Sequence, residues 1–161
     1  MGVVRYLFRL LVGVWVGGLL CFGAIVAPAL FQVLTPEQAA HVVRRVLPAI
    51  DAYALVAGGL LLILAFVHDG VPRSWPQRIR AVLLIGMTAC AALSAGWVTP
   101  EMDELRTRAN DSISSLPRED PIRREFGKLH GVSSALALAE LLAGLVVLAL
   151  APGPRRSTSA G

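Results

Sequence analysis

The sequence predicts an all-α polytopic membrane protein, a four-helix transmembrane bundle with amphipathic connector helices. Of its 161 residues, 55% are hydrophobic and only 16% are charged, against roughly 25% charged residues in an average soluble domain. The charges are also segregated, because four long stretches contain only two of them, Asp51 and Glu140. Those stretches are residues 10–31, 50–67, 82–98 and 132–150. Segregation of this kind excludes a soluble globule and a disordered chain, and two cysteines are too few for a disulfide-stapled secreted module.

Each stretch is long enough, with its neighbours, to cross a bilayer as a helix. About 20 apolar residues span a hydrocarbon core of roughly 30 Å. The first and last stretches reach that length directly, Leu47 extends the second, and Ile79 and Ala81 extend the third. The runs are continuously apolar without alternation, which argues against transmembrane β-strands. We therefore expect a four-span domain over residues 10–150.

An even number of spans places both ends of this domain on one side of the membrane. Basic residues flank the two sides almost equally, seven on the side of the termini and eight on the other. Arg5 and Arg9 precede the first span, and the first span usually dominates orientation. We expect the protein to lie in the inner membrane of a bacterium, with residues 1–9 and a disordered tail, 151–161, in the cytoplasm. A cleaved signal peptide is the less favoured alternative, because Pro28 falls inside the small-residue site.

The segment between the first two spans carries a helix-start pattern. Thr35 suits a cap, Pro36 suits the first helical position, and Gln38 completes a capping box. The apolar residues that follow recur on one helical face: Ala39, Val42, Val43, Val46 and Leu47. This predicts an amphipathic connector that either lies at the membrane interface or packs on the bundle as an ordinary connecting helix.

The segment after the third span starts in the same way, with Thr99, Pro100 and Glu101. We expect a second capped connector that ends at Pro117, and a further helix from Asp120 that runs into the fourth span. The shared Thr-Pro-Glu tripeptide fits a weak repeat of two-span units, although so short a match also arises by chance.

Small residues predict where the spanning helices pack, because they let backbones approach closely in lipid. In the first span Gly13, Gly17 and Cys21 follow one another at i+4 spacing, and Gly86, Cys90 and Ser94 do the same in the third span. The second span has Ala54 and Gly58, and the fourth has four residues close to one face: Ser133, Ala137, Glu140 and Gly144. We interpret the two cysteines as small buried fillers, since free cysteine behaves as a small apolar residue.

Three polar residues are candidates for function. Glu140 lies near the middle of the fourth span, where a bare carboxylate costs several kcal/mol. It is either a proton or cation relay, or a neutral carboxyl group that joins two helices through a hydrogen bond. We expect Asp51 at the headgroup end of the second span, with a structural role favoured. His130, just before the fourth span, is a pH-sensitive ligand or relay, or an interface histidine with a backbone partner.

Other chemistry finds little support in the sequence. His41, His68 and His130 are far apart and have no zinc-site spacing, so we expect no metal site and no cofactor. A Gly-rich phosphate loop, a nucleophile elbow and a CxxC motif are missing from the sequence, and we do not expect an enzyme. The net charge of +4 reflects arginines that flank membrane spans, so it does not indicate nucleic-acid binding.

Three segments together resemble a known family. Val26–Phe31 is similar to the APxxF pattern of the transmembrane-protein-205-like family, and Trp97–Pro100 is similar to the proline-ended third helix of that family. Phe126–Ser134 is similar to its FxxLHxxS pattern. The resemblance covers roughly residues 10–150 and implies a four-helix membrane bundle of unknown function. It marks as family-like positions Pro28, Phe31, Pro100, Phe126 and His130. A Met/Cys-rich path is lacking, which argues against soft-metal transport.

The sequence leaves three hypotheses of function. The first, which the sequence favours, is a membrane component that acts by packing with copies of itself or with a partner protein in the bilayer. The second is a transporter or channel-like subunit, as a homodimer, with Glu140 in a polar path. The third and weakest is a membrane enzyme or redox partner that uses Cys21, Cys90 or His130. A continuous cavity shared by Ser94, Glu140 and His130 would favour the second hypothesis, and two sulfurs within disulfide distance would favour the third.

Overall fold

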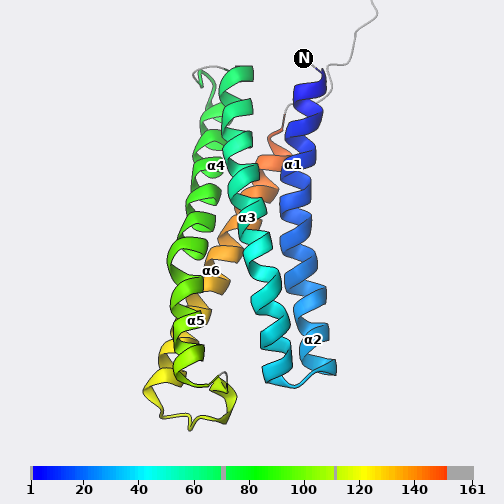
Figure 1. The fold of residues 1–161 in the computed structure, drawn as a ribbon. Coiled ribbons are helices and arrows are strands. Elements are labelled where there is room, and N and C mark those ends of the chain that lie inside the picture. Colours follow the sequence, from blue (N-terminus) through cyan, green and yellow to red (C-terminus); the bar gives the residue numbers. More distant parts are fainter. Residues whose placement is uncertain (1, 70–71, 111, 152–161) are drawn as a thin grey trace, which may run out of the picture.

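The computed structural model describes residues 2–69, 72–110 and 112–151, which form a bundle of long helices (Figure 1). Four helical segments are long and apolar enough to cross a membrane: Val3–Val33, Pro36–Val67, Trp75–Arg108 and Pro121–Ala149. No strand occurs in the described residues. The predicted fold class is confirmed. We expected a tail over residues 151–161, and residues 152–161 of it lie outside the described residues.

Two of the four segments contain a π-helical turn just before a proline. The first consists of α1 (Gly2–Cys21), η1 (Phe22–Val26) and α2 (Ala27–Val33). The third consists of α4 (Trp75–Leu93), η2 (Ser94–Val98) and α5 (Thr99–Arg108). A proline inside a helix clashes with the carbonyl four residues earlier. For Pro28 and Pro100 that carbonyl lies within the wider π turn, so the helix continues past each proline.

The two Thr-Pro-Glu sequences are therefore not structurally equivalent. Thr35 begins a new helix, where its N–H donates to Gln38 Oε1 at 3.1 Å and the N–H of Gln38 donates to Thr35 Oγ1 at 3.3 Å. That predicted capping box is confirmed. Thr99 instead lies within continuous helix and caps nothing, so the predicted capped start there is wrong.

The helix α3 (Pro36–Asp69) contains both the first connector and the second span in 34 residues. Pro48 lies inside it without ending it. The amphipathic segment is thus the first half of a spanning helix and packs on the bundle, because its Ala39 is fully buried. It does not form a separate interfacial helix.

The second connector is shorter than predicted. Its helix ends at Arg108, Asn110 adopts a left-handed conformation with φ of 49°, and a short turn, η3 (Ile113–Ser115), follows. Asparagine is one of the few residues that adopt this conformation readily. The prediction that α6 (Pro121–Ala149) starts at Asp120 and forms the fourth span is confirmed. Asp120 Oδ1 accepts a hydrogen bond of 2.8 Å from the N–H of Ile122.

The apolar core lies toward the end of the bundle where α1 begins and α6 ends, two points that lie at the same end in Figure 1. One buried residue from each of the four segments illustrates it: Trp15, Leu61, Leu84 and Val147. A smaller cluster at the other end joins η2, α5 and α6 through Val98, Met102, Leu105 and Leu129.

Two of the five glycines predicted to pack between helices lie at tight contacts. A Cβ atom at Gly58 would collide with Thr88, and one at Gly144 would collide with Val16. By contrast, a Cβ atom at each of the other three would meet nothing within 4 Å: Gly13, Gly17 and Gly86. The spacing of small residues thus located packing faces on the second and fourth spans, but on the first and third spans these glycines lie at positions without close contacts within this chain.

Candidate intramembrane cavity

The half of the bundle opposite the apolar core encloses a cavity of about 760 Å³. Its walls come from all four segments: the end of α1 with η1 and α2, the first half of α3, the η2–α5 region, and α6. Most lining side chains are apolar. Its polar lining includes, nearer the middle of the bundle, Asp51, Ser94, Thr99, His130, Ser133, Ser134 and Glu140.

Glu140 is held against the apolar core by a tryptophan. The indole Nε1–H of Trp15 donates a hydrogen bond of 3.1 Å to Glu140 Oε2. Glu140 is 5% exposed and Trp15 is 2% exposed. The other carboxyl oxygen, Oε1, has no hydrogen-bond partner within the part of the chain that the structure describes. Glu140 thus joins α6 to α1 through one oxygen and leaves the second available to the cavity.

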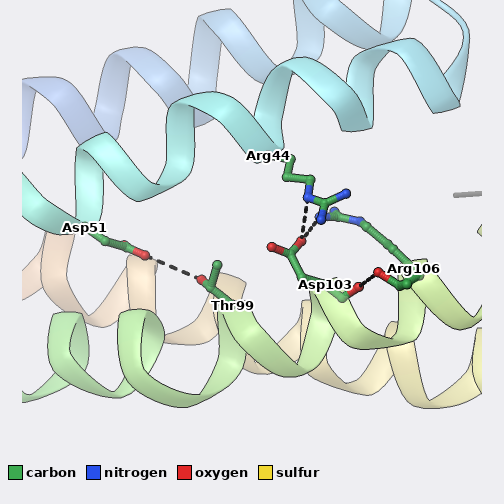
Figure 2. Close-up of polar contacts among 6 residues, drawn as sticks. Arg44, Asp51, Thr99, Asp103 and Arg106 are labelled. Carbon is green, nitrogen blue, oxygen red and sulfur yellow. Dashed lines mark hydrogen bonds and ion pairs between the residues drawn. The ribbon is translucent and has the colours of Figure 1, made fainter.

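Asp51 lies much deeper than the sequence indicated. We expected it at the headgroup end of a span, whereas it lies near the middle of α3 and is 8% exposed. The expected location is wrong because α3 already begins at Pro36. The hydroxyl group of Thr99 donates to Asp51 Oδ2 at 3.4 Å (Figure 2). Asp51 and Glu140 line the same cavity.

An ion pair links α3 to α5 further along the cavity wall (Figure 2). Arg44 Nε lies 3.3 Å from Asp103 Oδ1, and Arg106 donates to the same oxygen at 3.2 Å. All three residues line the cavity. Asp103 therefore holds one arginine from each of the two helices.

The loop before α6 is fastened at this same end. The hydroxyl group of Ser114 donates to the Glu37 carboxylate at the start of α3, and Arg123 donates to the carbonyl of Leu116. These contacts tie the loop to the first turns of α3 and α6. Glu37, Ser114 and Arg123 also line the cavity at this end.

We expect the Arg44–Asp103 pair to contribute modestly to the packing of α3 on α5. The single changes Arg44→Gln and Asp103→Asn and the double change form a double-mutant cycle, with unfolding measured in bicelles. Because both side chains are about one-third exposed, the coupling energy should be about 0.5 kcal/mol. The Arg108–Glu104 pair within α5 serves as a control that joins no helices. A coupling energy of zero for Arg44 and Asp103 would show that the ion pair does not join α3 to α5.

The remaining predicted residues fall into two groups. Phe31, Phe126 and His130 line the cavity, and the rings of Phe126 and His130 stack with centroids 6.5 Å apart. Pro28 and Pro100 do not line it, but each follows one of the π turns. The family-like positions thus either form the cavity wall or shape the helices around it.

The cysteines do not lie where we expected. Cys21 is exposed, Cys90 is half-buried, and both are free thiols. The interpretation as buried filler is wrong for Cys21, whose side chain faces away from the bundle core. Among the described residues, no three His, Cys, Asp or Glu side chains gather as a metal site would require.

Sequence reasoning missed two contributors to the site. From the sequence we assigned Trp15 no role in the site, although its position in the middle of a span is unusual for tryptophan, which is enriched at interfaces. That position could have indicated a buried partner for its N–H. Thr99 gave no such signal, because its contact with Asp51 depends on the packing of α3 against the η2–α5 junction.

Comparison with protein families matches residues 10–111 to a family described as Domain of unknown function (DUF4149). The chain belongs to the DUF4149 family. The DUF4149 match contains Trp15, Asp51 and Ser94, while Glu140 and His130 lie beyond it. No curated protein and no solved structure matches the chain.

Proposed function

We propose that this DUF4149 protein is a transporter-like membrane subunit in which Glu140 takes up and releases a proton or a cation. The observation that carries the proposal is that Ser94, His130 and Glu140 line one cavity. Intramembrane carboxyl groups that face a cavity are typical of ion and proton pathways. Packing alone gives no reason for a cavity of this size beside two buried carboxyl groups.

The cavity supports binding followed by a conformational change better than it supports an open channel. Beyond Glu140, toward the end where α1 begins, the described residues form an apolar core that includes Leu84, Met87 and Val147. Along that route a bound ion would face mainly apolar side chains and the buried Arg80, which lies over the ring of Phe8. Passage to the other side therefore requires the helices to rearrange, as in alternating access.

The competing hypothesis is a component that acts only by packing in the bilayer. This hypothesis predicts an apolar outer surface, and exposed residues such as Val56, Ile63 and Leu142 form one. Every spanning helix presents such a surface to lipid, so this feature does not distinguish the hypotheses. Four spans are few for a secondary transporter, so we propose that the working unit is a homodimer.

Further proposals concern the family of the protein, its membrane and its orientation there. We propose that within DUF4149 the chain is a transmembrane-protein-205-like member, supported by the three resembling segments described above. We also propose that it is not an enzyme, that it lies in a bacterial inner membrane, and that its first and last helices end in the cytoplasm. The positions of Arg5 and Arg9 support this orientation.

The proposal predicts that Glu140→Gln abolishes ion movement. In phosphatidylcholine vesicles with an imposed pH gradient and a trapped pH dye, the wild-type protein should collapse the gradient faster than protein-free vesicles. The variant should fall to the protein-free rate, because an amide cannot bind a proton or a cation as a carboxylate does. Potassium and sodium gradients, followed with trapped dyes, extend the assay to small cations.

Glu101→Gln is the matched control, because Glu101 is exposed and does not line the cavity. It should keep the wild-type rate. Thermal unfolding of each variant in detergent checks that the bundle is intact. A folded Glu140→Gln protein with the wild-type rate would overturn the proposal.

A further inference from the structure

Two carboxyl groups, those of Asp51 and Glu140, lie deep in the cavity. Neither Asp51 nor Glu140 forms an ion pair with any described residue. Glu140 lines the cavity and is only 5% exposed, and its Oε1 atom accepts no hydrogen bond from the described residues. A buried carboxylate without a positive partner is costly, so a ligand that brings a positive charge would stabilise both groups.

The walls around these groups suit an organic molecule better than a bare ion. Small-molecule sites typically enclose about 300–1,000 Å³ and are mainly apolar with a few placed polar groups. The volume of about 760 Å³ falls in this range. Phe22, Ile50 and Leu141 provide apolar wall from three different segments. A hydrated metal ion would leave these walls without contact.

The aqueous end of the cavity is a poor entrance for a cation. Three arginines and two acids line it: Arg44, Arg106, Arg123, Glu37 and Asp103. The arginines are in excess, and Asp103 is already paired with two of them. A cation that enters from the water would therefore meet net positive charge.

The lipid-facing side offers a neutral entrance between α2 and α6. In this half of the bundle α2 packs on α3, whereas α6 packs on α4, α5 and η2. Phe31 on α2 and Leu138 on α6 line the cavity but remain 57% and 55% exposed. Apolar side chains that line a cavity and also face lipid let a membrane-dissolved molecule enter sideways.

We propose that the cavity binds an amphiphilic amine that enters from the bilayer between α2 and α6 and places its ammonium group between Asp51 and Glu140. This inference rests on the proposed function and names the substrate class of that same site. The ammonium group donates charged hydrogen bonds to the carboxyl oxygens of Asp51 and Glu140, and the apolar body of the amine contacts the wall of α1, α3 and α6.

Trp15 provides a built-in probe, because its indole contacts Glu140. With Trp75→Phe and Trp97→Phe, its fluorescence reports binding in phosphatidylcholine nanodiscs. 4-Phenylbutylammonium should bind at least about tenfold more tightly than neutral 4-phenylbutan-1-ol, as expected for hydrogen bonds to a charged group. Asp51→Asn and Glu140→Gln should each abolish that preference, and Glu101→Gln should keep it. Ethanolammonium, which has no apolar body, should bind at least about tenfold more weakly than 4-phenylbutylammonium.

Substitutions of two alanines of α6 test the lateral entrance separately. Ala137→Phe fills a position that lines the cavity, whereas Ala139→Phe adds the same bulk at an exposed position outside it. Only the first should weaken binding of 4-phenylbutylammonium. Equal effects of the two changes would overturn the lateral entrance.

The remaining outcomes separate this inference from the proposed function. Equal binding of the amine and the alcohol, or loss of amine binding when phosphatidylethanolamine replaces phosphatidylcholine, would overturn a free amphiphilic amine as the ligand. If either occurs while Glu140-dependent collapse of the ion gradients persists, the proposed function stands without the inference. If Glu140→Gln changes neither assay, both fail.

Discussion

Replacing Trp15 with alanine should lower the free energy of unfolding by about 3 kcal/mol, the largest effect that we expect from a truncation in this protein. Trp15 is 2% exposed and packs within the apolar core. Its loss leaves a void among Leu61, Leu84 and their neighbours. It also removes the only hydrogen bond that the Glu140 carboxyl group accepts from a described residue. Between helices in lipid the cost comes from lost packing and the lost hydrogen bond, because apolar groups gain little by leaving lipid for a protein interior.

The measurement is reversible unfolding by a denaturing detergent in bicelles. Trp75→Ala is the matched control, because Trp75 is 72% exposed at the start of α4, and it should change the unfolding free energy by less than about 0.5 kcal/mol. Trp15→Phe separates the two causes, since it keeps much of the volume but lacks the donor. Equal stability of Trp15→Ala and Trp75→Ala would contradict the central position that the structure assigns to Trp15.

Gly144→Leu should cost about 3 kcal/mol by overpacking the junction of α1, α4 and α6. A Cβ atom at Gly144 already collides with Val16 and comes within 3.1 Å of Met87 Cε. Met87 can yield because its side chain is flexible, but Val16 is stiff at χ1 and 5% exposed. The leucine side chain must therefore push α6 away from α1, which also strains the hydrogen bond between Trp15 and Glu140.

Gly86→Leu is the control of identical chemistry, because Gly86 is exposed and a Cβ atom there meets nothing within 4 Å. It should be neutral within about 0.5 kcal/mol. The same bicelle unfolding assay compares the two variants. If Gly86→Leu proves the more destabilising, α4 must pack through its Gly86 face, either within the chain or against a second copy.

The local pattern of the sequence was sufficient for several elements. The capping box at Thr35 and the cap at Asp120 depend on residues within three positions of each other, so short-range chemistry determines them. The second connector shows the limit of this reasoning. Its apolar spacing continued to Leu116, yet the helix ends at Arg108, because Asn110 takes the left-handed conformation and the loop is instead tied to Glu37 and Arg123.

The four spans follow from the amino-acid pattern alone, since the hydrocarbon core directly requires about 20 residues without charge. The same pattern draws attention to Glu140, because a carboxylate inside such a run requires a partner. Three further features depend on how the helices pack: the partner is Trp15, Asp51 lies deep, and Gly144 makes the tight contact with Val16. The physical reason is that each depends on which helix faces which, and in lipid this is set by close packing between segments distant in sequence, which hydrophobicity does not encode.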